Sequence, residues 1–379
     1  MSAKNFKVKR LNTERMFEET KEMYFKHLEI ALSKSKSADG YYCNLVEELL
    51  CEHFNVPYAS LTTSGSIALS QIALSLGLRP GDEVITSPYT AAGAFMPIAL
   101  LGCKLNFVDI NRYGVINEDL LESSITSKTK AISAIGAFGN SPDYDKILIF
   151  ARKHNLLILN DICQCQHSIY NDQPVSTITD SCFISFGRTK EIPIYGTYGA
   201  VLFKDLNLKE KLSSTKYNGW NLGTNESVRY YKSIGTNGEP SEDKAVACYV
   251  SLLNSDKWLQ RRYQHGQLYR ELCVKNGITV LPIPPYNKFS TYQKFIVLVK
   301  DRMLVYKKLA DEGIQCHINY FENAAYNSVF PKQTNSFNVV DTFVNNSLTL
   351  PLDPWITTEE INLVVDKLVQ VVDKYDQRL

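Results

Sequence analysis

Short apolar runs alternate with amphipathic segments between about residues 60 and 205. This alternation is typical of a parallel sheet whose strands are joined by crossover helices. We predict strands in this block at Glu83–Thr86, Leu105–Asp109, Ala131–Ile135, Leu156–Asn160, Cys182–Phe186 and Ala200–Phe203. Apolar residues at helical spacing predict helices at Ser66–Leu76 and Tyr144–His154.

The pattern changes after Lys204. Residues 207–231 are polar and rich in Asn, Tyr and Ser, which is typical of a lid or an interface arm. Beyond them we predict helices at Asp243–Leu253, Arg262–Asn276 and Met303–Glu312, strands at Ile278–Pro282 and Lys294–Val299, and a last helix from a capping box at Thr357 and Glu360. The sequence therefore predicts an α/β fold. Its large, mostly parallel sheet domain covers residues 1–250, with an arm at about 207–240, and a smaller α/β domain covers residues 251–379.

Composition narrows the classes of partner. Of the 379 residues 44% are hydrophobic, and 41 Lys+Arg nearly balance 40 Asp+Glu. We therefore expect no nucleic-acid partner, which would need a local basic patch. No stretch approaches the roughly 20 apolar residues of a membrane span, and the N-terminus has no signal-peptide core. Nine scattered cysteines do not form a disulfide framework. We expect a cytoplasmic protein with no membrane partner.

Several common enzyme motifs are absent from the sequence. There is no G-x-G-x-x-G after the first strand, no G-x-x-x-x-G-K-[ST] and no H-E-x-x-H. The six histidines lack metal-ligand spacing, and Cys163-x-Cys165 has no second pair nearby, so we expect no metal site. Hydride transfer on a Rossmann fold and P-loop chemistry are thereby disfavoured.

Three features remain, in chain order. Ser64-Gly65-Ser66 opens a predicted helix, where free N–H groups and a hydroxyl could hold an anion. Asp161 ends an apolar strand, and Lys190 follows the strand that contains Ser185. Taken singly, these residues are more simply a helix N-cap, a turn cap and a solvated lysine. Taken together, they are the groups needed to hold pyridoxal 5′-phosphate (PLP).

Each group answers a chemical need of that cofactor. PLP is an electron sink only while its ring nitrogen is protonated. A carboxylate about 4 Å away, at an effective dielectric of about 20, favours this cation by about 4 kcal/mol, or about three pK units. A lysine in a desolvated pocket can form the Schiff base and afterwards shuttle a proton.

An ordered series of motifs along nearly the whole chain resembles the DegT/DnrJ/StrS family of PLP-dependent sugar aminotransferases. The resemblance lies in S-G-S-I-A-L at 64–69, G-D-E-V-I at 81–85, I-T-S-K-T-K-A-I at 125–132, N-D-I-C-Q at 160–164, S-F-G-R-T-K at 185–190, G-T-N at 235–237, G-I at 313–314 with Tyr320, and L-P at 350–351. It implies the fold-type I, aspartate-aminotransferase-like architecture. It also implies transfer of an amino group, from L-glutamate, to a keto-deoxysugar that is nucleotide-linked.

The resemblance assigns roles to individual residues. Lys190 would carry the cofactor as the internal aldimine, Asp161 would pair with the pyridine nitrogen, and Gln164 would lie next to the phenolic oxygen. The phosphate would be held by Gly65, Ser66 and Ser185. Asn237 would reach the phosphate of the other subunit, which implies a homodimer with shared active sites.

The sequence also departs from the family pattern. Ala91 stands where an aromatic residue often stacks on the cofactor, so we expect Tyr89 or Phe95 to cover the ring. Glu239 stands where an arginine is common, which leaves open a cyclitol or another non-nucleotide ketone as substrate, or a non-catalytic binding protein on the same fold. Candidate substrate residues are Tyr230, Tyr231, His317 and Tyr320.

Overall fold

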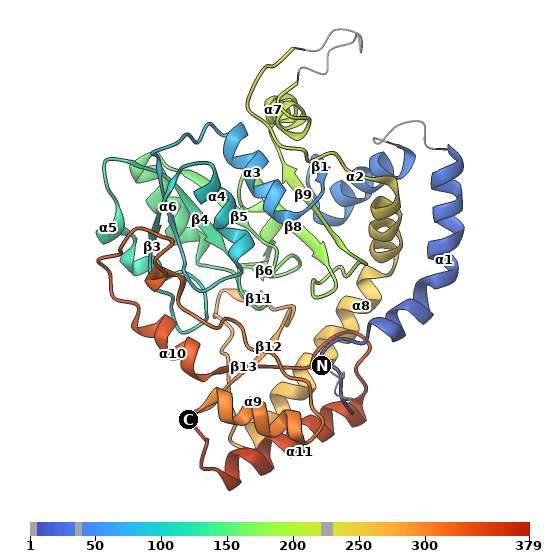
Figure 1. Cartoon of the computed structure of the whole chain (residues 1–379), viewed down its shortest axis with the longest axis vertical. Coiled ribbons are helices and arrows are strands. Elements are labelled where there is room, and N and C mark those ends of the chain that lie inside the picture. The colour runs from blue at the N-terminus through green and yellow to red at the C-terminus, as the bar shows by residue number, and fades with distance from the viewer. Residues whose placement is uncertain (1–5, 35–39, 221–229) are drawn as a thin grey trace.

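The computed structural model describes residues 6–34, 40–220 and 230–379. Its centre is a seven-stranded sheet with the order β1-β9-β8-β5-β4-β2-β3 (Figure 1). The strands are β1 Tyr58–Thr62, β2 Glu83–Thr86, β3 Lys104–Phe107, β4 Thr129–Ile135, β5 Leu157–Asp161, β8 Ser181–Gly187 and β9 Thr197–Phe203. Only β9 runs antiparallel to its neighbours. The predicted α/β architecture with a mostly parallel sheet is confirmed, and β1 is a strand that the sequence pattern did not reveal.

Both faces of this sheet are buried. Along β9, Ala200 and Leu202 contribute to one hydrophobic core, whereas Val201 and Phe203 contribute to the other, as the two-residue period of a strand requires. The helices of this part are α3 Gly65–Ser75, α4 Met96–Leu100, α5 Leu121–Ser124, α6 Tyr144–His154 and α7 Leu206–Lys216, with 3-10 turns η1 Ala92–Ala94, η2 Glu118–Leu120 and η3 Val175–Thr177. Helix α7 occupies the first third of the segment that we expected to be an irregular arm.

Helices near the N-terminus pack on a long central helix. They are α1 Thr13–Lys34 and α2 Tyr41–Phe54, and both contact α8 Glu242–Lys275. The prediction of two separate helices at Asp243–Leu253 and Arg262–Asn276 is wrong, because α8 is continuous over 34 residues. The expected boundary between residues 250 and 251 falls inside α8, and the division into two domains stays a prediction.

The C-terminal part forms a smaller α/β layer, at the bottom of Figure 1. Its sheet has the order β10-β12-β13, and a third sheet joins β11 to β6 and β7. The elements are β6 Ile169–Tyr170, β7 Gln173–Pro174, β10 Thr279–Val280, β11 Asn287–Phe289, β12 Phe295–Leu298, α9 Arg302–Asp311, η4 Ala324–Tyr326, α10 Asn338–Asn346, β13 Ser347–Leu350 and α11 Thr358–Lys374. The expected capping box opens α11. The N-terminal segment lies against this layer, where Val8 pairs with Ile314. Within the described ranges, each helix is too short or too polar to cross a bilayer.

Candidate active site

Two parallel strands at the centre of the large sheet bring the predicted acid and lysine together. Asp161 is the last residue of β5, and it pairs in register with Phe183 of the neighbouring strand β8. Lys190 lies in the turn that follows β8, and its N–H donates to the carbonyl of Gly187 at 2.9 Å. The carboxyl ends of parallel strands are the usual ligand-binding edge of an α/β sheet.

Cys163 links the acid to the lysine. Its backbone N–H donates to Oδ1 of Asp161 at 2.9 Å, and its carbonyl accepts from Nζ of Lys190 at 3.2 Å. Burial raises the pKa of Asp161, while the hydrogen bonding from Cys163 and the charge of Lys190 oppose this shift. A carboxylate buried in this way is stabilised by a cation placed beside it.

The start of α3 forms a small polar hollow against β8. The side chain of Ser64 caps the helix by accepting from the N–H of Ile67, so the N–H groups of Gly65 and Ser66 have no partner within the helix. A Cβ on Gly65 would lie 2.6 Å from the Cβ of Ser185, so only glycine allows this approach. No hydrogen bond is formed by the hydroxyls of Ser66 and Ser185 among the described residues. The hollow therefore offers two N–H groups and two hydroxyls to an anion.

Gln164 connects the sheet edge to the smaller layer. Its Nε2 donates to the hydroxyl of Tyr320 at 3.1 Å, and its Oε1 lies 3.5 Å from Nζ of Lys294. Burial raises the pKa of the Tyr320 phenol. Tyr320 thus lies next to a predicted cofactor residue, and its predicted role in substrate binding stays a prediction. Sequence reasoning missed Lys294, which has no local motif around it.

Tyr89 and Phe95 are both buried in the core of the large sheet. The hydroxyl of Tyr89 donates to the carbonyl of Asn319 and lies 2.7 Å from Oγ of Ser347, and its ring meets the ring of Tyr320 edge-on at 5.2 Å. Phe95 packs edge-on against other phenylalanines. These contacts are those of packed core aromatics, and a stacking role for either ring stays a prediction.

Glu191, the residue after Lys190, anchors the turn that holds the lysine. Glu191 is fully buried, and its carboxylate accepts from the backbone N–H of His167 at 3.0 Å and from the hydroxyl of Thr291. Arg262 of α8 donates to the carbonyl of Lys190 at 3.4 Å. Sequence reasoning missed this set, because its four members come from four separate segments and only Glu191 is adjacent to a motif.

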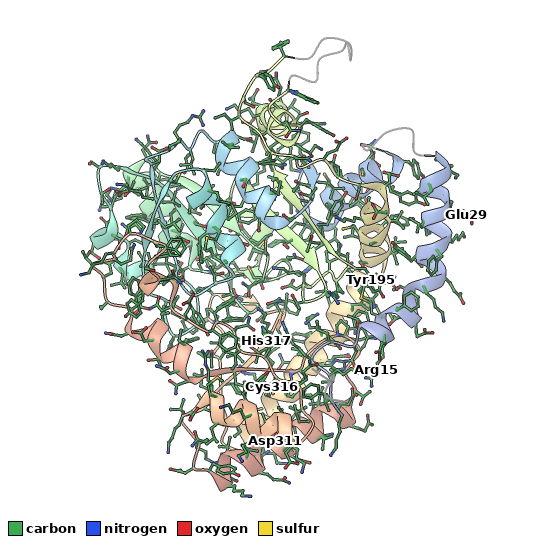
Figure 2. All side chains as sticks on the ribbon, viewed as in Figure 1. Arg15, Glu29, Tyr195, Asp311, Cys316 and His317 are labelled. Atoms are coloured by element: carbon green, nitrogen blue, oxygen red, sulfur yellow. The ribbon has the colours of Figure 1, made fainter. Side chains whose placement is uncertain are left out.

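The remaining candidates lie apart from the acid and the lysine. Tyr230 and Tyr231 are exposed on the arm, at 57% and 78%. Asn237 is also exposed, and it pairs with Tyr217 where the arm returns toward the sheet. His317 lies between the large sheet and α9, as labelled in Figure 2, with Nδ1 3.1 Å from the guanidinium of Arg10. Of the four predicted substrate residues, Tyr320 is therefore the one that contacts Gln164 directly.

Comparison with known proteins decides the family. Residues 18–369 match the DegT/DnrJ/EryC1/StrS aminotransferase family. This chain belongs to that family. It is 31% identical over 284 residues to a dTDP-4-amino-4,6-dideoxy-D-glucose transaminase of Shigella dysenteriae, covering 74% of each chain. It is 29% identical over 337 residues to a dTDP-3-amino-3,6-dideoxy-alpha-D-galactopyranose transaminase of Aneurinibacillus thermoaerophilus, covering 87% of this chain and 88% of the relative.

Solved structures agree on the fold. DesV of S. venezuelae, solved in complex with a ketimine intermediate, has a TM-score of 0.89 at 22% identity, with 96% of this chain and 98% of that chain covered. As a member of the DegT/DnrJ/EryC1/StrS family, the protein is an aminotransferase with PLP as its cofactor.

The residues present fit this cofactor. The phosphate needs donors, and the hollow at Gly65, Ser66 and Ser185 supplies N–H and hydroxyl groups that have no other partner among the described residues. The pyridine nitrogen needs a carboxylate, and Asp161 is a buried one. The aldehyde needs an amine, and Lys190 is half-buried at the same edge of the sheet.

Proposed function

We propose that this aminotransferase moves an amino group from L-glutamate to the ketone of a nucleotide-linked deoxysugar, for amino-sugar biosynthesis. The observation that carries the proposal is the Asp161–Cys163–Lys190 connection at one sheet edge, beside an anion hollow. The substrate class is supported by the two dTDP-sugar transaminases to which the chain is similar over most of its length.

Each residue of the site would have a distinct task. When bound, the cofactor supplies an electron sink that makes a C–H bond next to the substrate nitrogen acidic. Nζ of Lys190 would accept that proton from the substrate carbon. It would then donate the proton to C4′, the aldehyde carbon of the cofactor. The carbonyl of Cys163 orients this amine. Asp161 would stabilise a positive charge on the pyridine nitrogen, and its burial would strengthen that interaction.

Other residues would bind and orient. Gly65, Ser66 and Ser185 would hold the phosphate through N–H and hydroxyl donors. Gln164 would lie at the phenolic oxygen, where Tyr320 orients its amide through the 3.1 Å hydrogen bond. Tyr89 would support the side of the site that faces the cofactor ring, because its ring packs edge-on against the ring of Tyr320.

We further propose a cytoplasmic homodimer in which Asn237 completes the site of the partner subunit. Exposed apolar side chains on the arm support a contact with a second copy, since Tyr230, Tyr231 and Ile234 are 57%, 78% and 74% exposed. Eight of the nine cysteines are buried and no disulfide joins the described ones, as suits a reducing compartment.

The test uses purified protein with PLP and a panel of dTDP- and UDP-linked keto-deoxysugars, together with a ketocyclitol. We expect a visible absorbance band from covalently held cofactor, which is lost in Lys190→Ala, and glutamate-dependent amination of a nucleotide-linked sugar. Arg188→Ala is a matched control in the same turn, because its side chain is exposed. Failure to bind PLP would contradict the proposal, and turnover of the cyclitol alone would replace its substrate class.

A further inference from the structure

Two basic residues outside the predicted cofactor set, Lys294 and Arg10, line one hollow beside Thr189. Lys294 immediately precedes β12, and its Nζ lies 3.5 Å from Oε1 of Gln164. The same ammonium lies over two aromatic rings, 5.4 Å from the centroid of Phe138 and 5.6 Å from that of Tyr320. Aromatic faces and one amide oxygen hold a cation in place but do not neutralise its charge.

The second cation comes from the N-terminal segment. Backbone hydrogen bonds join Val8 to Gly313 and Gln315, and the N–H of Arg10 donates to the side chain of Gln315 at 2.9 Å. This pairing brings Arg10 to a hollow that it lines together with Lys294, Thr349 and Thr189, the residue before the catalytic lysine. The position of Arg10 is therefore fixed by the fold.

Neither cation has a carboxylate partner in the part of the chain that the structure describes. Among residues 6–34, 40–220 and 230–379, no acidic oxygen within 4.0 Å of either is recorded, although fourteen other ion pairs are formed there. The group nearest to Arg10 is His317, whose pKa is lowered to about 4 by burial and by the charges of Arg10 and Lys294, so it is neutral at pH 7. Burial, with the charges of Lys190 and Arg10, lowers the pKa of Lys294 to about 7. Both side chains are only partly buried. Removing water from a cation without supplying a counter-charge is costly, and an incoming anion would reduce that cost and favour the charged form of Lys294.

We infer that Lys294 and Arg10 form the site that binds the carboxylate of the amino donor. The inference rests on the proposed function, and it names the part of the site that recognises the amino acid. An α-amino acid carries its carboxylate on the carbon that bears the reacting nitrogen, so the two groups must bind close together. The hollow meets this need because Thr189 forms one of its walls. The diphosphate of a sugar nucleotide is separated from the ketone by the sugar ring and needs a more distant site.

The test measures binding of three probes to the PLP-loaded protein by calorimetry: glutarate, dTDP and UDP-glucuronate. We expect Lys294→Gln and Arg10→Gln each to weaken glutarate binding by about tenfold or more, the usual cost of removing one charged hydrogen-bond partner. Binding of dTDP and UDP-glucuronate should not change. Lys300→Gln is the matched control, since this lysine is paired with Asp376 on the surface.

Each alternative outcome has a definite meaning. Wild-type glutarate affinity in both variants overturns the inference. So does a loss that falls on dTDP, which would assign the cations to a phosphate, or on UDP-glucuronate, which would assign them to a carboxylate on the sugar. The proposed function fails separately, through absence of PLP binding or of amination of a nucleotide-linked sugar, neither of which is read by glutarate affinity.

Discussion

Nδ1 of His167 lies 2.8 Å from Oε2 of Glu191, the residue that follows Lys190. The same carboxylate accepts from the hydroxyl of Thr291, which lies between β11 and β12. The lysine turn is therefore attached both to the loop after β5 and to the C-terminal layer. This arrangement makes Glu191 a positioning residue for Lys190, because it touches the loop and not the reacting atoms.

Glu191→Ala should destabilise the protein by about 3–5 kcal/mol, because it leaves buried donors on His167 and Thr291 without an acceptor. Glu191→Gln retains an acceptor oxygen and should cost about 1–2 kcal/mol. Urea unfolding measures both values. Glu210→Ala is the control, since Glu210 pairs with Lys232 at the surface and should change stability by less than about 0.5 kcal/mol. A change below about 1 kcal/mol in Glu191→Ala would argue against the positioning role.

Asp161→Asn should lower kcat by about a thousandfold, since the substitution keeps the shape but removes the charge worth about three pK units at the pyridine nitrogen. Cofactor should remain bound, because the phosphate hollow and Lys190 are unchanged. Single-turnover absorbance with glutamate measures the effect. Asp180→Asn, at an exposed turn on the same sheet, should retain wild-type rates. Near-normal turnover in Asp161→Asn would remove this residue from the chemistry.

Mixing two inactive variants should restore activity if the site is shared between subunits. Lys190→Ala and Asn237→Ala each damage both sites of their own homodimer. Mixed dimers regain one intact site, so an equal mixture that has exchanged subunits should reach about a quarter of wild-type activity. Light scattering establishes the oligomeric state beforehand. A mixture no more active than its components would place Asn237 in the site of its own chain, or outside it.

Acid should destabilise the fold through His53. Its Nε2 lies 2.7 Å from that of His167, and burial, with the charge of His167, lowers the pKa of His53 to about 4. The unfolded state, with a pKa near 6.5, binds more protons between pH 4 and 6.5, so stability falls as the pH drops through this window. The contribution is about 3 kcal/mol at most.

The control for this prediction must account for Glu118. Burial raises the pKa of Glu118 to about 7, so it titrates in the same window with the opposite sign. The difference between wild type and His53→Gln isolates the histidine, and we expect the variant to have the flatter fall in unfolding free energy between pH 7 and 5. Parallel pH profiles for the two proteins would contradict the prediction.

The local pattern of apolar and polar residues was enough to predict the strands next to the site and the polar residues at their ends. Strands β2, β4, β5 and β8 are short apolar runs bounded by polar residues; Asp161 ends β5, and Lys190 lies in the turn after β8. Pattern failed for α8, because Ala245 and its neighbours share a hydrophobic core with α2, whereas Tyr269 and Cys273 share another with α11. A helix that changes partners shows no single apolar stripe, so it was divided at its polar middle.

The residues missed at the site share a physical cause. Arg10 and Lys294 reach it from the N-terminal segment and from β12, through pairings between distant parts of the chain. Nothing in the neighbouring sequence marks either residue. Neither contacts an acidic side chain among the described residues, which is visible only once three-dimensional contacts are known, so charge composition alone could not reveal them.

The residues proposed to bind the cofactor and those proposed to bind the amino donor come from different parts of the fold. Asp161, Ser185 and Lys190 come from the large sheet, whereas Lys294 and Tyr320 come from the smaller layer. Under the proposed function, mutations at Lys294 would change recognition of the amino donor, while Asp161, Ser185 and Lys190 would keep the cofactor bound. For enzyme engineering, libraries confined to the smaller layer and the N-terminal segment should yield more folded, cofactor-loaded variants than libraries that include the edge of the large sheet.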